Sequence, residues 1–195
     1  MPRPKSFDPD TVLTKAMDVF WEKGYDAASV SDLTAAMGIN RFSLYDTFGD
    51  KHTLYIKALE SYEHNVLVPI LERIHAFHSI SEMEEHFMGM IEYQREHHDA
   101  PCCMIQKAAV NMAAHDESAL DRVDTTRRRI NEAFVHVFTR LIDEGQLRDG
   151  LTPQQAAWLV MFVYDGITTY AGSSYPDDRS KQDAVRALFD SLRAD

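Results

Sequence analysis

Residues 37–54 read MGINRFSLYDTFGDKHTL and decide the fold of the first third of the chain. Gly38 and a short polar link stand before an eight-residue segment, 41–48, and a second glycine follows it. Asn40 precedes this segment and Asp50 precedes the next one, and both residue types cap helix N-termini. The stretch predicts a short helix over 41–48 between a helix that ends before Gly38 and one that begins after Asp50.

The same helical spacing of apolar residues continues in both directions, and no sustained alternation typical of strands occurs. Asp8 before Pro9 is typical of a helix start, and Ser29 with Asp32 forms a capping box. Pro69 is expected to kink one long helix. The prediction is an all-α protein of about nine helices, over about 9–23, 29–37, 41–48, 51–77, 81–97, 102–114, 117–144, 153–171 and 179–192.

Two short helices joined by a glycine-containing turn and supported by a preceding helix are the layout of a helix-turn-helix motif. In that layout Leu33, Leu44 and Phe48 pack inward. The residues expected to remain outside on the third helix are Arg41, Phe42, Ser43, Tyr45 and Thr47. Arginine pairs with guanine edges, whereas Tyr45, Lys51 and the helix start at Ser29 suit phosphate oxygens.

The segment from Thr11 to Tyr62 resembles the DNA-binding region of the TetR/AcrR family of one-component transcriptional regulators. The resemblance rests on AMDVFWEKGYDAASVSDL (residues 16–33), AMGINRFSLYDTFGDK (residues 36–51) and Leu54. It implies a three-helix DNA-binding domain, 1–50, followed by a ligand-sensing and dimerisation domain of about six helices, 51–195. The function implied is that of a homodimeric DNA-binding regulator, most simply a repressor.

Carried over by position, the resemblance implies base contacts by Arg41, Ser43 and Thr47, with Phe42 against a thymine methyl group. The full set of expected DNA-binding residues is Arg3, Lys5, Ser29, Asn40, Arg41, Phe42, Ser43, Tyr45, Thr47 and Lys51. Arg3 and Lys5 are expected to form a flexible N-terminal arm. Asp46 places a negative charge on the same helix, where it either accepts from a cytosine amino group or is simply solvated.

The composition limits how DNA is bound. The formal net charge is −11, and residues 1–55 hold six Lys/Arg and eight Asp/Glu, a net −2. DNA contact therefore depends on a few placed cations and backbone amides rather than on a broad basic surface. The two adjacent cysteines, the absence of an apolar N-terminal run and the absence of a membrane-spanning stretch predict a cytoplasmic protein without a membrane partner.

A small apolar molecule is the expected inducer, bound in the second domain. The residues expected to line its pocket are aromatic, aliphatic or methionine side chains: Tyr62, Val66, Phe87, Ile91, Tyr93, Met104, Phe134, Phe138, Trp158 and Phe162. Most of these side chains also suit an ordinary core.

An alternative release mechanism involves Cys102 and Cys103. The stretch APCCMIQKAAVNMAAHDESALDRV (residues 100–123) is similar to a family subgroup with a Gly-Cys-Leu-type motif, some of whose members sense oxidants or electrophiles. Cys103 stands at the motif position, and Lys107, one helical turn further, would favour its thiolate. A small apolar filler role for both cysteines is the competing interpretation.

The dimer is expected to form through two helices. Residues 153–171 are apolar on nearly every side, and such a helix needs covering on every side. The interface set combines this helix with the C-terminal stripe: Val160, Val163, Tyr164, Ile167, Val185, Leu188 and Leu192. The run Arg127-Arg128-Arg129 is interpreted as a solvated, ion-paired face.

Rival functions find less support. The sequence contains none of the metalloprotease, hydrolase, P-loop or dinucleotide motifs, so an enzyme is not expected and no cofactor is predicted. A helical adaptor has no reason to display the Arg41–Lys51 side chains. His97-His98 beside the cysteines, and His75 with His78, fit no standard metal-ligand spacing, and no metal site is predicted.

Overall fold

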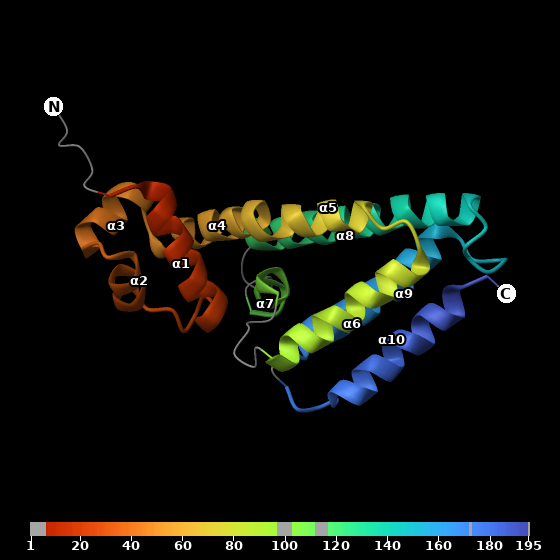
Figure 1. Cartoon of the computed structure of the whole chain (residues 1–195). Helices are drawn as coiled ribbons and strands as arrows, with labels where there is room; N and C mark the ends of the chain where they lie inside the picture. Colours follow the sequence, from red (N-terminus) through yellow and green to blue (C-terminus); the bar gives the residue numbers. More distant parts are fainter. Residues whose placement is uncertain (1–6, 97–102, 112–116, 172, 195) are drawn as a thin grey trace. The chain divides into compact units, whose positions relative to one another are not determined.

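The computed structural model describes residues 7–96, 103–111, 117–171 and 173–194. Over these residues the expected all-helical fold is confirmed (Figure 1). The helices are α1 (Pro9–Lys23), α2 (Val30–Met37), α3 (Arg41–Phe48), α4 (Lys51–Tyr62), the π-helical turn η1 (Glu63–Leu67), α5 (Val68–His75), α6 (Ile80–Glu96), α7 (Met104–Asn111), α8 (Glu117–Asp143), α9 (Pro153–Thr169) and α10 (Asp178–Leu192).

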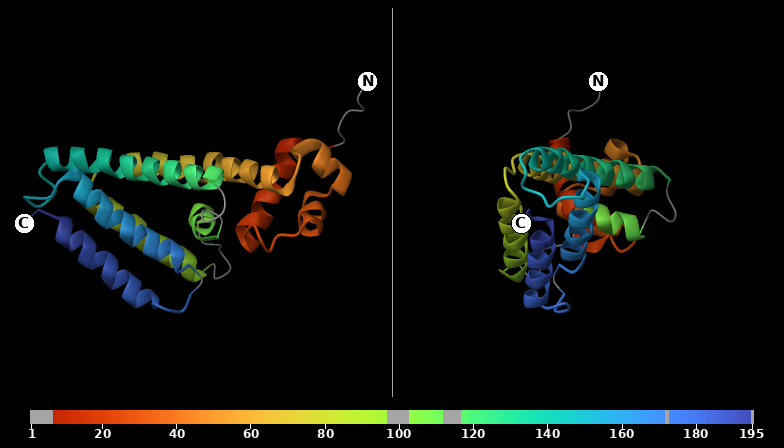
Figure 2. Two further views of the ribbon diagram at one scale, coloured as in Figure 1. Left: turned by 180° about the vertical axis from the view of Figure 1, so that it is seen from behind. Right: turned by 90° about the vertical axis from the view of Figure 1, so that its right-hand side faces the viewer.

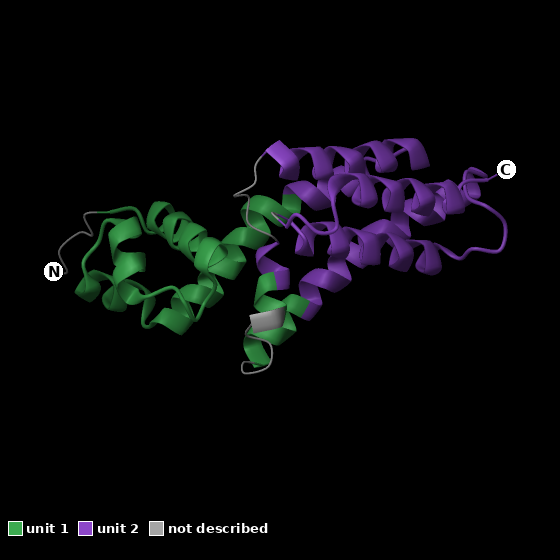
Figure 3. Ribbon diagram, turned by 90° about the horizontal axis from the view of Figure 1, so that it is seen from below, with its two compact units in different colours: residues 1–68, 107–123 green, residues 69–106, 124–195 purple. Residues whose placement is uncertain are grey.

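Contacts divide the chain into two compact units (Figure 3). Unit 1 comprises residues 1–68 and 107–123, and unit 2 comprises residues 69–106 and 124–195. This grouping differs from the predicted division after residue 50, because α4 packs against α1 and therefore joins the first unit. The division of roles between 1–50 and 51–195 stays a prediction.

The helices of unit 1 begin where their capping residues predict. Ser29 and Asp32 form a complete capping box at α2, with the Asp32 amide 3.1 Å from the Ser29 hydroxyl oxygen. The Asn40 side chain accepts the Ser43 amide at 2.8 Å to start α3, and Asp50 accepts the Thr53 amide at 2.6 Å to start α4. These side chains satisfy amides that a helix cannot pair internally.

The sequence predicts one helix over 51–77 with a kink at Pro69. The structure instead divides this range into two α-helices joined by a π-helical turn. A π-helical turn, η1, separates α4 from α5 and ends two residues before Pro69. Proline lacks an N–H group, and its ring collides with the carbonyl one turn earlier in a regular α-helix. The wider turn lies where that collision would occur, and it keeps the chain helical up to α5.

Unit 2 is a bundle in which α6, α9 and α10 lie side by side, as both views of Figure 2 show. Fully buried aromatic side chains form its core: Phe87, Phe134, Phe138 and Phe189. The Phe87 ring is 5.4 Å from the Phe189 ring and 6.2 Å from the Tyr164 ring, between centroids. Thr152 and Gln155 form the predicted capping box at α9. No helix within the described residues is long and apolar enough to cross a membrane.

Candidate nucleic-acid interface

The turn between α2 and α3 is fixed by Gly38. Its backbone lies in the left-handed region, with φ +69°, and the Ile39 amide donates back to the Thr34 carbonyl at 3.2 Å. Side chains other than glycine rarely adopt this conformation. Leu33 and Leu44 are fully buried on the inner sides of the two helices, so α3 is held with one face outward.

The outer face of α3 carries an arginine–tyrosine pair. The Arg41 guanidinium lies 5.5 Å from the centroid of the Tyr45 ring, and its Nη2 is 3.4 Å from the Tyr45 hydroxyl oxygen. Phe42 beside them is 79% exposed. An aromatic ring below a guanidinium restricts its orientations while its N–H groups remain able to bind base edges or phosphates.

The other predicted contacts of α3 differ in accessibility. Ser43 is half-buried and Asn40 is exposed, with the Asn40 side-chain oxygen already engaged as the helix cap. Thr47 is the exception to the prediction. Its hydroxyl oxygen is buried and has no hydrogen-bond partner among the residues that the structure describes, so in this conformation it faces inward rather than toward a duplex.

Two residues predicted to contact phosphates, Lys51 and Ser29, have neighbours that the sequence pattern does not indicate. The Lys51 ammonium lies 4.4 Å from the centroid of the Tyr25 ring. Ser29 is exposed, and its hydroxyl is 2.6 Å from an Asp32 carboxylate oxygen whose partner oxygen binds Lys23 at 2.8 Å. The Lys23 and Ser29 hydrogen bonds hold the pKa of the Asp32 carboxyl far below its usual value. Arg3 and Lys5 lie outside the described residues.

Two further cations of unit 1 come from the later part of the chain. Lys107 Nζ donates to the carbonyl oxygens of Trp21, at 3.1 Å, and Glu22, at 2.7 Å, which end α1. Arg122 on α8 binds Glu60 at 2.7 Å and Glu63 at 3.1 Å. Lys107 therefore binds the end of α1, a contact that its spacing from Cys103 does not predict.

Release through the cysteines stays a prediction. Cys103 is half-buried and lies directly before α7, whereas Cys102 lies outside the described residues. His97 and His98, the neighbours considered for a metal, also lie outside the described residues.

The ten predicted pocket residues differ in burial and belong to both units, and the pocket itself stays a prediction. Phe87, Ile91, Met104, Phe134 and Phe138 are buried within unit 2, while Tyr62, buried, and Val66, half-buried, belong to unit 1. Tyr93, Trp158 and Phe162 are 58%, 45% and 66% exposed and so do not line an interior pocket in this conformation. Three clefts of about 600, 640 and 330 Å³ are lined by other residues.

The predicted dimer residues are mostly covered within the single chain. Val160, Tyr164, Ile167, Val185, Leu188 and Leu192 are buried within unit 2, and Val163 is half-buried. The exposed apolar face of α9 is formed instead by Trp158, Leu159 and Phe162. The Trp158 and Phe162 rings are stacked with centroids 5.9 Å apart. Periodicity predicts that this helix is apolar on nearly every side, but it does not predict which of its faces the core covers. The dimer contact stays a prediction.

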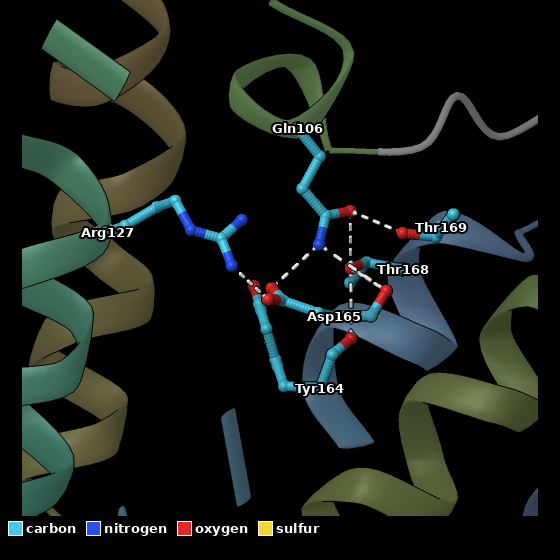
Figure 4. Close-up of polar contacts among 6 residues, drawn as sticks. All are labelled: Gln106, Arg127, Tyr164, Asp165, Thr168 and Thr169. Atoms are coloured by element: carbon cyan, nitrogen blue, oxygen red, sulfur yellow. Dashed lines mark hydrogen bonds and ion pairs between the residues drawn. The ribbon is translucent and has the colours of Figure 1, made fainter. Parts of the chain in front are cut away.

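Arg127 is ion-paired, as predicted, but only partly exposed. It binds Asp165 of α9, which also accepts from Gln106, at the start of α7 (Figure 4). Arg128 and Arg129 are exposed, as expected.

Comparison with known families decides the identity. The model "Bacterial regulatory proteins, tetR family" matches residues 12–58, and "BetI-type transcriptional repressor, C-terminal" matches residues 105–194. The uncharacterized HTH-type transcriptional regulator YezE of Bacillus subtilis is 34% identical over 148 residues, which cover 75% of this chain and 76% of that protein. The chain belongs to the TetR family of bacterial transcriptional regulators.

Other TetR-family proteins extend the comparison. The repressor ComR of Escherichia coli is 45% identical over 60 residues, covering 31% of this chain and 29% of that protein. The regulator CifR, solved with 26-bp double-strand operator DNA, is 27% identical with a TM-score of 0.82, covering 97% of this chain and 99% of that chain. The protein is therefore a helix-turn-helix transcriptional regulator, and the family is not enzymatic.

Proposed function

We propose that this TetR-family protein is a homodimeric repressor that inserts α3 into successive major grooves of a palindromic operator. The observation that carries this proposal is the Arg41–Tyr45 pair on the outer face of α3, beside the exposed Phe42. Arg41 would read a guanine, while Tyr45 and Lys51 would bind phosphates. The operator-bound structure of the similar CifR supports the same use of this domain.

A second copy of the chain is the partner that best fits the exposed face of α9. Trp158, Leu159 and Phe162 form a run of large apolar side chains on one helix, and such a surface usually marks an interface. A two-fold contact would repeat the same face on both copies. The two α3 helices would then bind half-sites about one helical turn of DNA apart.

Release from DNA is proposed to follow the binding of a small apolar molecule within unit 2. The buried residues Phe87, Met104 and Phe134 of unit 2 supply the kinds of aromatic and thioether surface that such a ligand needs. A ligand can only shift the protein between arrangements that bind it with different affinity. A thermal-shift screen of apolar compounds, followed by operator release with the hits, tests this step.

The alternative is release through oxidation or alkylation of Cys103, which is half-buried rather than enclosed. Mass spectrometry after mild peroxide or quinone treatment, with Cys103→Ser as the control, distinguishes the two. If no adduct forms, or if an adduct leaves operator binding unchanged, the thiol mechanism is excluded.

A gel shift with DNA taken from beside the protein's own gene tests the central proposal. We expect binding whose affinity falls steeply with salt, by a logarithmic slope of about −0.9 for each phosphate neutralised on B-DNA. An operator carrying both half-sites should bind far better than one carrying a single half-site. If no fragment binds at low ionic strength, the proposal is wrong.

A further inference from the structure

The Asp165 carboxylate in unit 2 binds side chains from two helices that are distant from it in the sequence. Asp165 Oδ1 accepts from Gln106 Nε2 at 2.7 Å, and Asp165 Oδ2 binds the Arg127 guanidinium (Figure 4). Gln106 belongs to α7 and Arg127 to α8, while Asp165 projects from α9. Both oxygens of a single side chain are therefore engaged, each by a different helix.

Low exposure and further hydrogen bonds stabilise the contacts of Asp165 with Gln106 and Arg127. The Asp165 and Arg127 side chains are only 21% and 35% exposed, which strengthens a charge-assisted hydrogen bond relative to one in water. The Gln106 amide is oriented from its other end, because its Oε1 lies 2.8 Å from the Thr168 hydroxyl and 3.3 Å from the Thr169 hydroxyl. Gln106 Nε2 thus points at Asp165.

The two residues held by Asp165 flank a segment that belongs to unit 1. The chain leaves unit 2 after Gln106 and returns to it at residue 124, three residues before Arg127. Within unit 1, the segment 107–123 is attached at both of its ends. Lys107 binds the last carbonyls of α1, and Arg122 binds two glutamates of α4 and η1.

We propose that Asp165 is a positioning residue for operator binding, through the ends of segment 107–123. By fixing Gln106 and Arg127, it restricts where Lys107 and Arg122 lie, and these two cations bind the helices that support α3. Without Asp165, Lys107 and Arg122 sample more arrangements, and only a fraction of these arrangements holds α1 and α4 as DNA binding requires. Apparent operator affinity falls in proportion to that fraction. The inference rests on the proposed operator binding.

The test compares Asp165→Asn with a matched control in the same unit. Glu84→Gln breaks the Arg193–Glu84 pair between α10 and α6, whose side chains are 34% and 19% exposed, almost the same as those of Arg127 and Asp165. Neither Arg193 nor Glu84 contacts residues 106–127 through a hydrogen bond or an ion pair in the described part of the chain. Both variants should lower the melting temperature by similar amounts.

Operator affinity should separate the two variants. We expect Asp165→Asn to weaken operator binding at least about fivefold, the lower end of usual coupling between sites, and Glu84→Gln to leave it within experimental error. Arg127→Lys keeps the charge and should give an intermediate loss, which also serves if Asp165→Asn fails to fold. Equal affinities for Asp165→Asn and Glu84→Gln, or Arg127→Lys indistinguishable from wild type, would overturn the proposal.

Two further readouts exclude a merely structural role. Amide hydrogen exchange in the last turn of α1, around the Gly24 amide, should quicken in Asp165→Asn but not in Glu84→Gln. The double variant Asp165→Asn/Lys107→Met should bind the operator no more weakly than the weaker of the two single variants, because both act through one segment. Additive losses, or unchanged exchange in α1, contradict the inference. If the wild type binds no operator, the proposed function itself fails.

Discussion

At the scale of single residues, Arg41 carries the sequence-reading part of the proposal. Its guanidinium rests on Tyr45 of the same helix, so it loses less freedom on binding than an unrestrained side chain. We predict that Arg41→Ala weakens binding to the cognate operator by about 1–3 kcal/mol and relaxes the preference at one base pair. Affinities for operators changed one base pair at a time give the measurement.

Lys51→Ala provides the contrast to this variant. Lys51 lies over the Tyr25 ring at the start of α4, and a lysine ammonium at a helix start suits a phosphate. We expect its loss to weaken all operator variants to a similar degree and to reduce the salt slope by about 1. A base-dependent effect of Lys51→Ala, or a uniform effect of Arg41→Ala, would reverse the two assignments.

His86 should make unit 2 sensitive to pH. It is half-buried on α6, with its ring 5.4 Å from Phe77, and burial, followed by the charge of Arg73, lowers its pKa below 6.5. The unfolded chain then binds the proton more readily than the folded one. Stability from the neutral ring is therefore fully present above pH 6.5 and is lost as pH falls through the lower, folded-state pKa.

We predict that the melting temperature of the wild type declines between about pH 7.5 and pH 5.5, and that His86→Gln flattens this decline. Calorimetry at fixed ionic strength makes the measurement. Loss of stability below about pH 4 is a separate effect, because the pKa values of Asp8, Asp32, Asp50 and Asp177 are lowered by hydrogen bonds at helix starts. The same pH profile in wild type and variant would remove His86 as the cause.

Residue partners were the least predictable feature of the sequence. Thr47 lies at a helical position that periodicity places outward, yet its hydroxyl is buried. The one-turn spacing predicts that Lys107 acts on Cys103, whereas its ammonium binds the Glu22 carbonyl of α1, 85 residues earlier in the chain. Helical period predicts the face of a side chain, but a long flexible side chain selects its partner by three-dimensional proximity.

At the scale of elements, the helix boundaries were predictable because they are locally encoded. The caps at Asp8, Ser29, Asn40 and Thr152 begin their helices as the sequence indicates. Hydrogen bonds between neighbouring residues decide such starts, whatever the rest of the fold does. The π-helical turn and the covered face of α9 were not predictable, since packing between distant elements determines both.

Two glycines should respond in opposite ways to the same substitution. Gly38 ends α2 with φ +69°, whereas Gly89 lies in the middle of α6 with ordinary helical geometry, and an added Cβ meets no atom within 4 Å at either position. We predict that Gly38→Ala destabilises the protein by about 1 kcal/mol and that Gly89→Ala stabilises it by about 0.5–1 kcal/mol. Urea denaturation of both variants measures the difference.

The structural environment is open at both sites, so backbone conformation alone accounts for the expected sign. Gly38→Ala should also weaken operator binding, because the turn sets the orientation of α3 relative to α2. A stabilising effect at Gly38 would show that the turn tolerates a side chain and that its geometry is not fixed by glycine.

At the scale of the whole molecule, the net charge of −11 weakens the attraction of a single chain to DNA, so binding through a second copy would raise the affinity. One chain offers only a few cations near α3, and the overall charge opposes approach to DNA. Two chains that bind two half-sites together multiply the effective affinity without any additional basic residue, provided that their spacing matches the duplex. Under the proposed function, operator binding by such an acidic chain would depend on the proposed dimer contact as much as on α3.

A substitution at Phe162 tests whether operator binding depends on the proposed dimer contact. It is 66% exposed on α9 and stacks on Trp158, so Phe162→Glu places a charge in the proposed contact without disturbing the core of unit 2. We predict a monomer by sedimentation and at least about a tenfold loss of affinity for a two-half-site operator. Tyr93→Glu, at a similarly exposed aromatic position on α6, should remain dimeric and bind normally. A dimeric Phe162→Glu protein would place the contact elsewhere, while a monomer with full operator affinity would disprove the paired half-site arrangement.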